Sequence, residues 1–322
     1  GICLNKTSNF VVQNIRTKRV NKYSITYCNS ASISNRDILL ETVSDGVHSK
    51  GPNWNVVLDG ISGANNDDFI VHTSNDPEQA YAFNVFPRNA GATIQTVYGP
   101  FTLGHTDQGT IADGGGELIG FTARNIRPKF KNARILLSGA DAAKPFNGMS
   151  GILIDGFTPS FDNEATNGSY DIPSICISSE PSTNHTSVIS DVTIRNWSIL
   201  GNPGKAFVNF YDQQVGGPYA GSQVVIKSLV FDNVRTAKPI VRKAGAQWEF
   251  LDGRVWTNGD RWSVGKLTFR DCRWDVDTGT SGGDCSVVYI NNNNANGEYL
   301  DSLVFDYCQL NHVGGNQVLR LL

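Results

Sequence analysis

The sequence is poor in the features that mark helical, nucleic-acid-binding and membrane-spanning proteins. Methionine occurs once in 322 residues, and long amphipathic stretches rich in Ala, Leu, Glu and Lys are missing. The 27 basic and 30 acidic side chains give a net charge of −3, without the basic excess of a nucleic-acid-binding protein. No apolar run approaches the roughly 20 residues of a membrane-spanning helix. We therefore expect neither nucleic-acid binding nor membrane insertion.

Cysteine is scarce and is not arranged for metal binding. The six cysteines form no CxxC pair, and none lies in a Cys/His cluster with metal-ligand spacing. Unpaired cysteine is a common core residue, so free thiols within strands are the favoured interpretation, with disulfides left open. No metal and no cofactor are expected.

Small and polar residues are abundant instead. The 33 glycines, together with frequent Asn, Asp, Ser and Thr, are typical of many short strands joined by tight turns. No stretch reads as a flexible linker, so we expect a single domain over residues 1–322. Both ends fall inside strand-like sequence, which suggests a piece of a longer chain.

One short motif recurs along the chain. It alternates apolar and variable residues over four places, has Asn, Asp or a small residue at the fifth, and is apolar again at the sixth. The alternation predicts a strand with one buried face, and the fifth residue predicts a left-handed bend. The copies begin at Phe10, Ile38, Val56, Ile152, Val192, Leu229, Leu267 and Leu303.

The spacing of the copies favours a coil of stacked strands. The last four copies, which begin at Val192, Leu229, Leu267 and Leu303, follow one another at nearly equal intervals. A β-sandwich would instead alternate strands every roughly 8–12 residues without a recurrent signature. Stacked turns of a coil share one core, and each strand pairs with its equivalents above and below. We predict an all-β parallel β-helix with loops inserted between its turns. Ile194, Phe231, Phe269 and Phe305 should point into the core.

Three carboxylates are spaced to meet on such a coil. If one turn of the coil is as long as the interval from Asp45 to the Asp67–Asp68 pair, Asp45 lies over that pair on a strand about 4.8 Å away. Both members of the pair face outward only if a turn or bulge lies there. Like charges so close, with no Lys or Arg expected beside them, should raise the pKa of Asp67.

The segment Asp45-Gly46-Val47-His48, followed by Asn66-Asp67-Asp68-Phe69-Ile70, resembles the polygalacturonase family of glycoside hydrolases. That family carries an Asp-Gly segment one turn before an Asp-Asp pair on a right-handed parallel β-helix. The resemblance implies Asp67 as the general acid, with Asp45 and Asp68 holding the water and the anomeric centre inverting. The family's Gly-His-Gly and Arg-x-Lys motifs have no clean counterpart, which leaves the galacturonan substrate unsupported.

In its composition and its loops inserted between strands, the sequence resembles those of bacteriophage tailspikes and capsule depolymerases. Those proteins are trimeric parallel β-helices, rich in Gly, Asn and Asp, that cut or bind bacterial surface polysaccharide. The resemblance implies a homotrimer on the virion tail, with a secreted enzyme as the alternative location. A non-catalytic glycan-binding adsorption protein and a polysaccharide lyase are the alternative functions.

Two histidines and three tryptophans complete the candidate site. His48 and His72 flank the carboxylates as substrate-binding candidates, with packing or hydrogen bonding as the alternative. Trp248, Trp256 and Trp262 would suit a sugar-stacking surface, because a pyranose face is apolar and Trp has a large apolar ring with an N–H group that can donate a hydrogen bond. The same tryptophans are equally suited to packing an inserted loop or a subunit contact.

Overall fold

The computed structural model consists of β-strands and turns, with no helix among the residues that it describes. No helix in this part of the chain is therefore long and apolar enough to cross a membrane. The described residues are 1–64, 69–73, 88–90, 93–100, 112–114, 117–130, 135–139, 148–158, 160–161, 175–179, 186–200, 207–210, 223–237, 240–241, 248–253, 261–277, 284–290, 299–313 and 315–321.

The first sheet is the largest, and its pairings are parallel wherever the chain is described. Its strands are β1 (Ile2–Asn5), β2 (Ser8–Arg16), β3 (Ile25–Glu41), β4 (Val47–Ala64), β5 (Ile70–Thr73), β6 (Arg88–Ala90), β7 (Thr93–Pro100), β9 (Glu117–Ile119), β10 (Thr122–Phe130), β12 (Gly148–Phe157), β13 (Ser160–Phe161), β15 (Thr186–Arg195), β18 (Gln223–Asp232), β22 (Arg261–Arg270) and β25 (Tyr299–Asp306).

Two smaller sheets are also parallel. The second sheet contains β8 (Ala112–Gly114), β11 (Ile135–Gly139), β14 (Ile175–Ser179), β17 (Val208–Asn209), β21 (Trp248–Asp252), β24 (Asp284–Ile290) and β27 (Gly315–Leu321). The third sheet contains β16 (Ser198–Ile199), β19 (Arg235–Thr236), β20 (Ile240–Val241), β23 (Arg273–Asp277) and β26 (Gln309–Val313).

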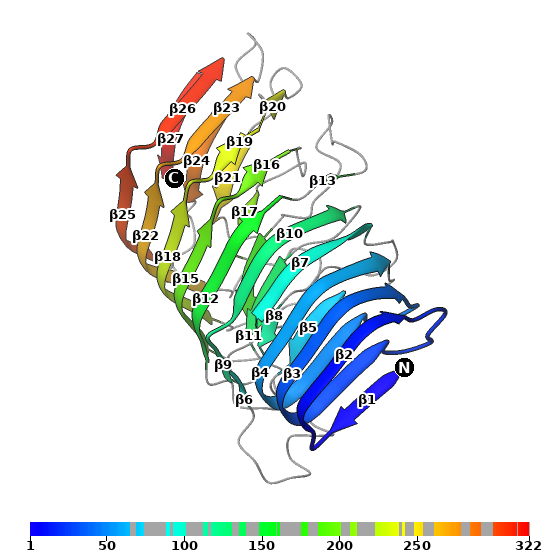
Figure 1. Cartoon of the computed structure of the whole chain (residues 1–322). Coiled ribbons are helices and arrows are strands. Elements are labelled where there is room, and N and C mark those ends of the chain that lie inside the picture. Colours follow the sequence, from blue (N-terminus) through cyan, green and yellow to red (C-terminus); the bar gives the residue numbers. More distant parts are fainter. Residues whose placement is uncertain are drawn as a thin grey trace.

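The strands follow one another along an elongated stack in chain order. In Figure 1 the blue N-terminal strands lie at one end and the red C-terminal strands at the other. The parallel pairing contradicts the β-sandwich alternative, whose sheets are antiparallel. It confirms an all-β chain built from parallel sheets.

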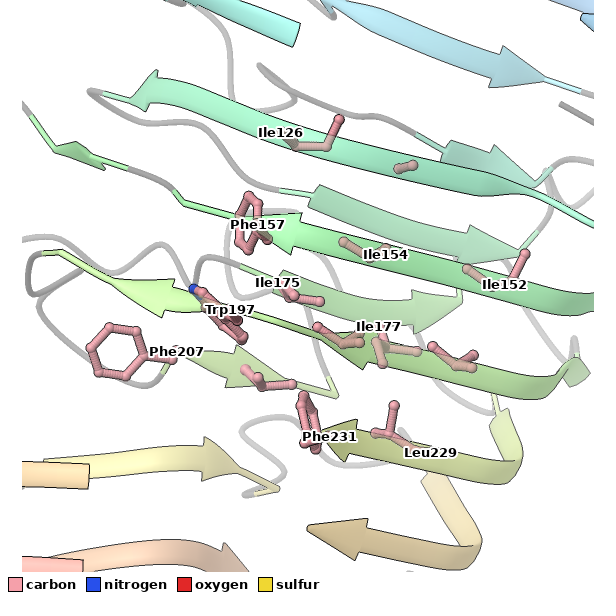
Figure 2. Packing of buried hydrophobic residues seen from close by; sticks show 14 of the residues in the cluster. Ile126, Ile152, Ile154, Phe157, Ile175, Ile177, Trp197, Phe207, Leu229 and Phe231 are labelled. Carbon is pink, nitrogen blue, oxygen red and sulfur yellow. The ribbon is translucent and has the colours of Figure 1, made fainter. Parts of the chain in front are cut away.

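The third place of the motif forms a column of buried side chains. Pairing between consecutive strands aligns Ile154, Ile194, Phe231, Phe269 and Phe305. The first four are fully buried, and Phe305 packs against the core from the last strand of the sheet. The three phenylalanine rings stack with centroids 5.2 and 5.0 Å apart. The predicted inward stack is confirmed, and Figure 2 shows Ile154 and Phe231 within this packing.

The fifth place of the motif adopts the predicted left-handed conformation. Its φ is positive in seven of the eight copies, from 49° at Asp271 to 76° at Gly156. The exception is Thr42, the fifth residue of the copy predicted to begin at Ile38, and that copy is out of register with the others. Strand pairing sets Ile33 opposite both Phe10 and Val56, so the early turns are equal in length. The assignment to Ile38 is wrong, because the true third place holds a polar residue, Asn35, that hid the pattern.

A further copy escaped the sequence pattern. Phe121 to Ile126 pairs in register with the copy beginning at Ile152, and its fifth residue, Asn125, has a φ of 51°. Its third residue is the small Ala123 rather than a bulky apolar one. The left-handed Gly120 just before it and the Asn125-Ile126 dipeptide are the signals that would have located this strand.

The fourth place of the motif forms a column of alternating charge on the outer face. We call this column the charge ladder; its members are Arg124, Asp155, Arg195, Asp232, Arg270 and Asp306. Arg195 Nη2 donates to Asp155 Oδ2 at 2.8 Å, and Arg270 Nη1 lies 3.8 Å from Asp232 Oδ2. The Arg195 hydrogen bond lowers the pKa of Asp155, and the pKa of Arg195 is raised in return. A register slip would separate these opposite charges, so the ladder favours the observed register.

Candidate functional site

Asp45 lies in the turn that leads into β4, between two neighbouring turns of the chain. The Ser24 amide donates to the Asp45 carbonyl at 3.2 Å, and the Val47 amide donates to the Phe69 carbonyl at 2.9 Å. A side chain on Gly46 would meet that Phe69 carbonyl oxygen at 2.3 Å. Glycine is therefore required after Asp45, because the neighbouring backbone occupies the space of a Cβ atom.

The Asp45 carboxylate is held by His48. Asp45 Oδ2 and His48 Nδ1 are 2.6 Å apart, and both residues are at least nine-tenths buried. Where the Asp45 carboxylate accepts this hydrogen bond, His48 Nδ1–H is the donor. Ser44 Oγ lies 3.4 Å from the other oxygen, Asp45 Oδ1. The carboxylate is thus fixed in position rather than rotating in solvent.

Three residues that the sequence patterns did not single out surround this pair. The Tyr23 ring meets the His48 ring edge-on, with centroids 4.8 Å apart. The ammonium groups of Lys50 and Lys22 lie 4.7 and 5.1 Å from the centre of the same Tyr23 ring. Two cations therefore lie against the aromatic ring that contacts His48.

The missed residues have a signal in the sequence. Tyr23 precedes Asp45 by the same one-turn step that relates Ile25 to its strand partner Val47. Lys50 follows His48 by two places on one strand and so shares its face. The same turn length counted backwards from Asp45 reaches Lys22 and Tyr23.

A pocket of about 230 Å³ opens beside this group. Lys22, Tyr23 and Lys50 form part of its wall, so the pocket and the Asp45–His48 pair share the Tyr23 ring. The rest of its wall is made of Cys3, Leu4, Asn5, Thr26 and Cys28. Its size and its two cations suit one polar or anionic group of a ligand rather than a whole oligosaccharide.

Asp67 and Asp68 lie outside the described residues. The strands that follow the carboxylates are described, and Val47 pairs with Ile70. The step from Val47 to Ile70 equals the step from Asp45 to Asp68, so the turn length on which the carboxylates were predicted to meet is confirmed. The meeting itself stays a prediction.

His72 faces the interior rather than a ligand. It is 1% exposed and lies edge-on to Phe121 with ring centroids 5.6 Å apart, and neither ring nitrogen has a hydrogen-bond partner among the described residues. Burial, followed by the charge of His48, lowers the pKa of His72 to about 3. A ring sealed from solvent cannot bind a substrate, so the packing alternative applies to His72.

The tryptophans that are described also belong to the interior. Trp248 is fully buried within the aromatic core and packs on Phe207. Trp262 is 2% exposed, packs on Phe210 and donates its indole N–H to the Gly253 carbonyl at 2.8 Å. Neither ring offers a face to a pyranose, so the packing alternative applies to both. Trp256 lies outside the described residues.

The described part of the chain contains no group of three or more His, Cys, Asp or Glu side chains placed to hold a metal ion. Its candidate chemistry rests on carboxylate, imidazole, phenol and ammonium groups. Comparison of the chain with protein-family models, curated proteins and solved structures gives no match to any of them.

Proposed function

We propose that the three parallel sheets are the faces of one right-handed parallel β-helix, and that this helix is a glycoside hydrolase that degrades bacterial capsule or O-antigen. The observation that carries the proposal is the fixed Asp45–His48 pair, one turn before the Asp67–Asp68 pair in the sequence. Stacked turns of equal length bring carboxylates of consecutive strands within reach of one glycosidic bond.

The proposed roles follow from the chemistry of inversion. Asp67 protonates the leaving oxygen as the general acid, while Asp45 and Asp68 hold and activate the water on the opposite face of the sugar. Such acid and base carboxyls lie about 6.5–9.5 Å apart, which leaves room for the water. His48 supports this assignment, because its hydrogen bond to Asp45 Oδ2 holds the carboxylate in one orientation.

The test is cleavage of a panel of capsule and O-antigen polysaccharides by the purified chain. We expect new reducing ends without ultraviolet-absorbing unsaturated products. Asp67→Asn should lower turnover by about 10²–10⁴-fold while glycan binding persists, because the amide keeps the shape but donates no acidic proton. Asp59→Asn, on the outer face of β4 away from the pair, is the matched control and should cleave like the wild type.

The two cations on the Tyr23 ring, which contacts His48, favour a second candidate, a polysaccharide lyase. A lyase needs a base to abstract a proton and a cation to neutralise the neighbouring acid group, and Tyr23, Lys22 and Lys50 supply such groups. Unsaturated ends in the products, with Asp67→Asn fully active, would select the lyase. Glycan binding without cleavage by any preparation would select an adsorption protein.

We propose a homotrimer on a virion tail as the assembled state, with a secreted enzyme as the alternative location. Edge strands of stacked sheets require protection from incorrect pairing, and assembly of three chains is one means of providing it. Sedimentation of the chain at several concentrations tests the assembly. A monomer throughout would contradict the trimer, without bearing on cleavage.

A further inference from the structure

Two cysteines occupy equivalent positions on the last two turns of the first sheet. Cys272 and Cys308 are the sixth residues of their motif copies, each directly after a left-handed residue, Asp271 or Tyr307. Earlier turns carry Trp197 and then Val234 at this place. The two thiols thus end a column of inward-facing side chains.

Backbone pairing on both sides fixes the two cysteines opposite each other. The Asp271 amide donates to the Asp306 carbonyl at 2.9 Å, and the Gln309 amide donates to the Cys272 carbonyl at 2.8 Å. In-register parallel strands are about 4.8 Å apart, which falls within the roughly 4.4–6.8 Å between Cα atoms of disulfide-bonded cysteines.

The two side chains also share one conformation. Cys272 Sγ donates to the Arg270 carbonyl at 3.2 Å, and Cys308 Sγ donates to the Asp306 carbonyl at 3.5 Å. Each sulfur therefore contacts the residue two places earlier in its own turn, and Cys272 Sγ also lies 3.5 Å from the Phe231 carbonyl oxygen of the preceding turn. The Cys308 side chain is also a hydrogen-bond partner of the Cys272 thiol, so the two sulfurs are neighbours.

The two thiols differ in access to solvent. Cys272 is 1% exposed, and burial, with Cys308 contributing, raises its pKa to about 12. Cys308 is half-buried beside Tyr307, which is 87% exposed. A reagent therefore reaches Cys308 first, and Cys272 reacts only with a sulfur already held next to it.

We propose that Cys272 and Cys308 form an oxidisable dithiol site that a small-molecule disulfide, such as oxidised glutathione, converts into an intramolecular disulfide. The Cys308 thiolate attacks the reagent, forms a mixed disulfide and releases one thiolate. Cys272 then loses its proton, attacks Cys308 Sγ and expels the second thiolate. Two protein thiols are oxidised and one reagent disulfide is reduced to two thiols.

The test is incubation of the native chain with oxidised glutathione, followed by peptide mapping without reduction. We expect a linked peptide pair containing Cys272 and Cys308, lighter than the two free peptides by two hydrogen atoms. The bond closes a loop as long as one late turn of the chain, so the midpoint of thermal unfolding should rise on the order of 5 °C.

Three variants distinguish the proposed cross-link from other reactions with glutathione. Cys272→Val reproduces the side chain found one turn earlier and should hold glutathione on Cys308 without a cross-link. Cys308→Ser should show neither the cross-link nor the thermal shift. Cys3→Ser removes an exposed thiol elsewhere and should behave like the wild type. Glutathione retained on wild-type Cys308, a link to a different cysteine, or reaction confined to Cys3 would overturn the proposal.

Discussion

At the scale of single residues, the interior of the early turns contains polar side chains to which the described residues offer no hydrogen bond. His72 is 1% exposed and Asn35 is fully buried, and within the part of the chain that the structure describes none of their side-chain nitrogen and oxygen atoms has a hydrogen-bond partner. A buried polar group in this state costs free energy of folding. Each of these two residues therefore lowers the stability of this end of the stack.

His72 should make the protein sensitive to acid. The folded state keeps it neutral down to about pH 3, whereas the unfolded state binds a proton below about pH 6.5. Above about pH 6.5, protonation of His72 therefore does not affect the free energy of unfolding. Below that pH the free energy of unfolding falls by about 1.4 kcal/mol for each pH unit, until about pH 3. Between about pH 7 and pH 4.5, we expect the free energy of unfolding, measured with urea, to fall by about 3 kcal/mol more in the wild type than in His72→Leu. Equal pH profiles for the two proteins would contradict this.

Replacing Asn35 should stabilise the protein. Its neighbours in the inward column are Val12 and Leu58, so Asn35→Leu exchanges an unpaired amide for apolar contact. We expect the free energy of unfolding to rise by about 1–3 kcal/mol, measured by urea denaturation. Asn53→Leu is the matched control and should destabilise, because Asn53 donates to Ser49 Oγ at 2.9 Å and accepts from the Ser30 amide at 3.0 Å.

At the scale of strands, the charge ladder should contribute a small, salt-dependent energy. The Arg195 side chain is 43% exposed, so water screens its bond to Asp155. A double-mutant cycle of Asp155→Asn and Arg195→Gln should give a coupling of about 0.5–1 kcal/mol that shrinks in about 1 M salt. The pKa of Asp155 is lowered, so this energy is present at neutral pH and disappears as acid protonates the carboxyl.

The charge ladder also contains a second, longer ion pair with which the first can be compared. Arg270 and Asp232 are 3.8 Å apart, farther than the 2.8 Å of the pair tested above. The same cycle applied to Asp232→Asn and Arg270→Gln should give a smaller coupling. A larger coupling for the longer pair would show that strand register, rather than the direct ion pair, determines the energy.

At the scale of the whole molecule, protection from amide exchange should decline from the middle of the stack to its ends. An inner strand such as β18 pairs with neighbours on both sides, whereas β25 is the last strand of the first sheet. Each turn of a stacked protein is stabilised by its neighbours, so an end turn loses one interface. Hydrogen exchange followed by mass spectrometry should find slow exchange in β15 and β18 and faster exchange in β1 and β25. Uniform protection would contradict a stack stabilised by nearest neighbours.

The sequence by itself determined the strands, the parallel pairing of the late turns and the inward stack of Phe231, Phe269 and Phe305. Alternating hydrophobicity and a residue that tolerates a left-handed backbone are local properties, so they are visible without a structure. The pattern failed where a local residue contradicted its environment, as at Asn35 and Ala123.

Only the tertiary structure decided which distant side chains meet. The contacts of Tyr23 with His48 and Lys50, and the stacking of Cys272 on Cys308, depend on the length of one turn, which the loops change along the chain. Burial is likewise a property of the surroundings rather than of the residue. Trp248, Trp262 and His72 therefore suited a binding surface in the sequence but lie in the interior, because the neighbouring strands cover them.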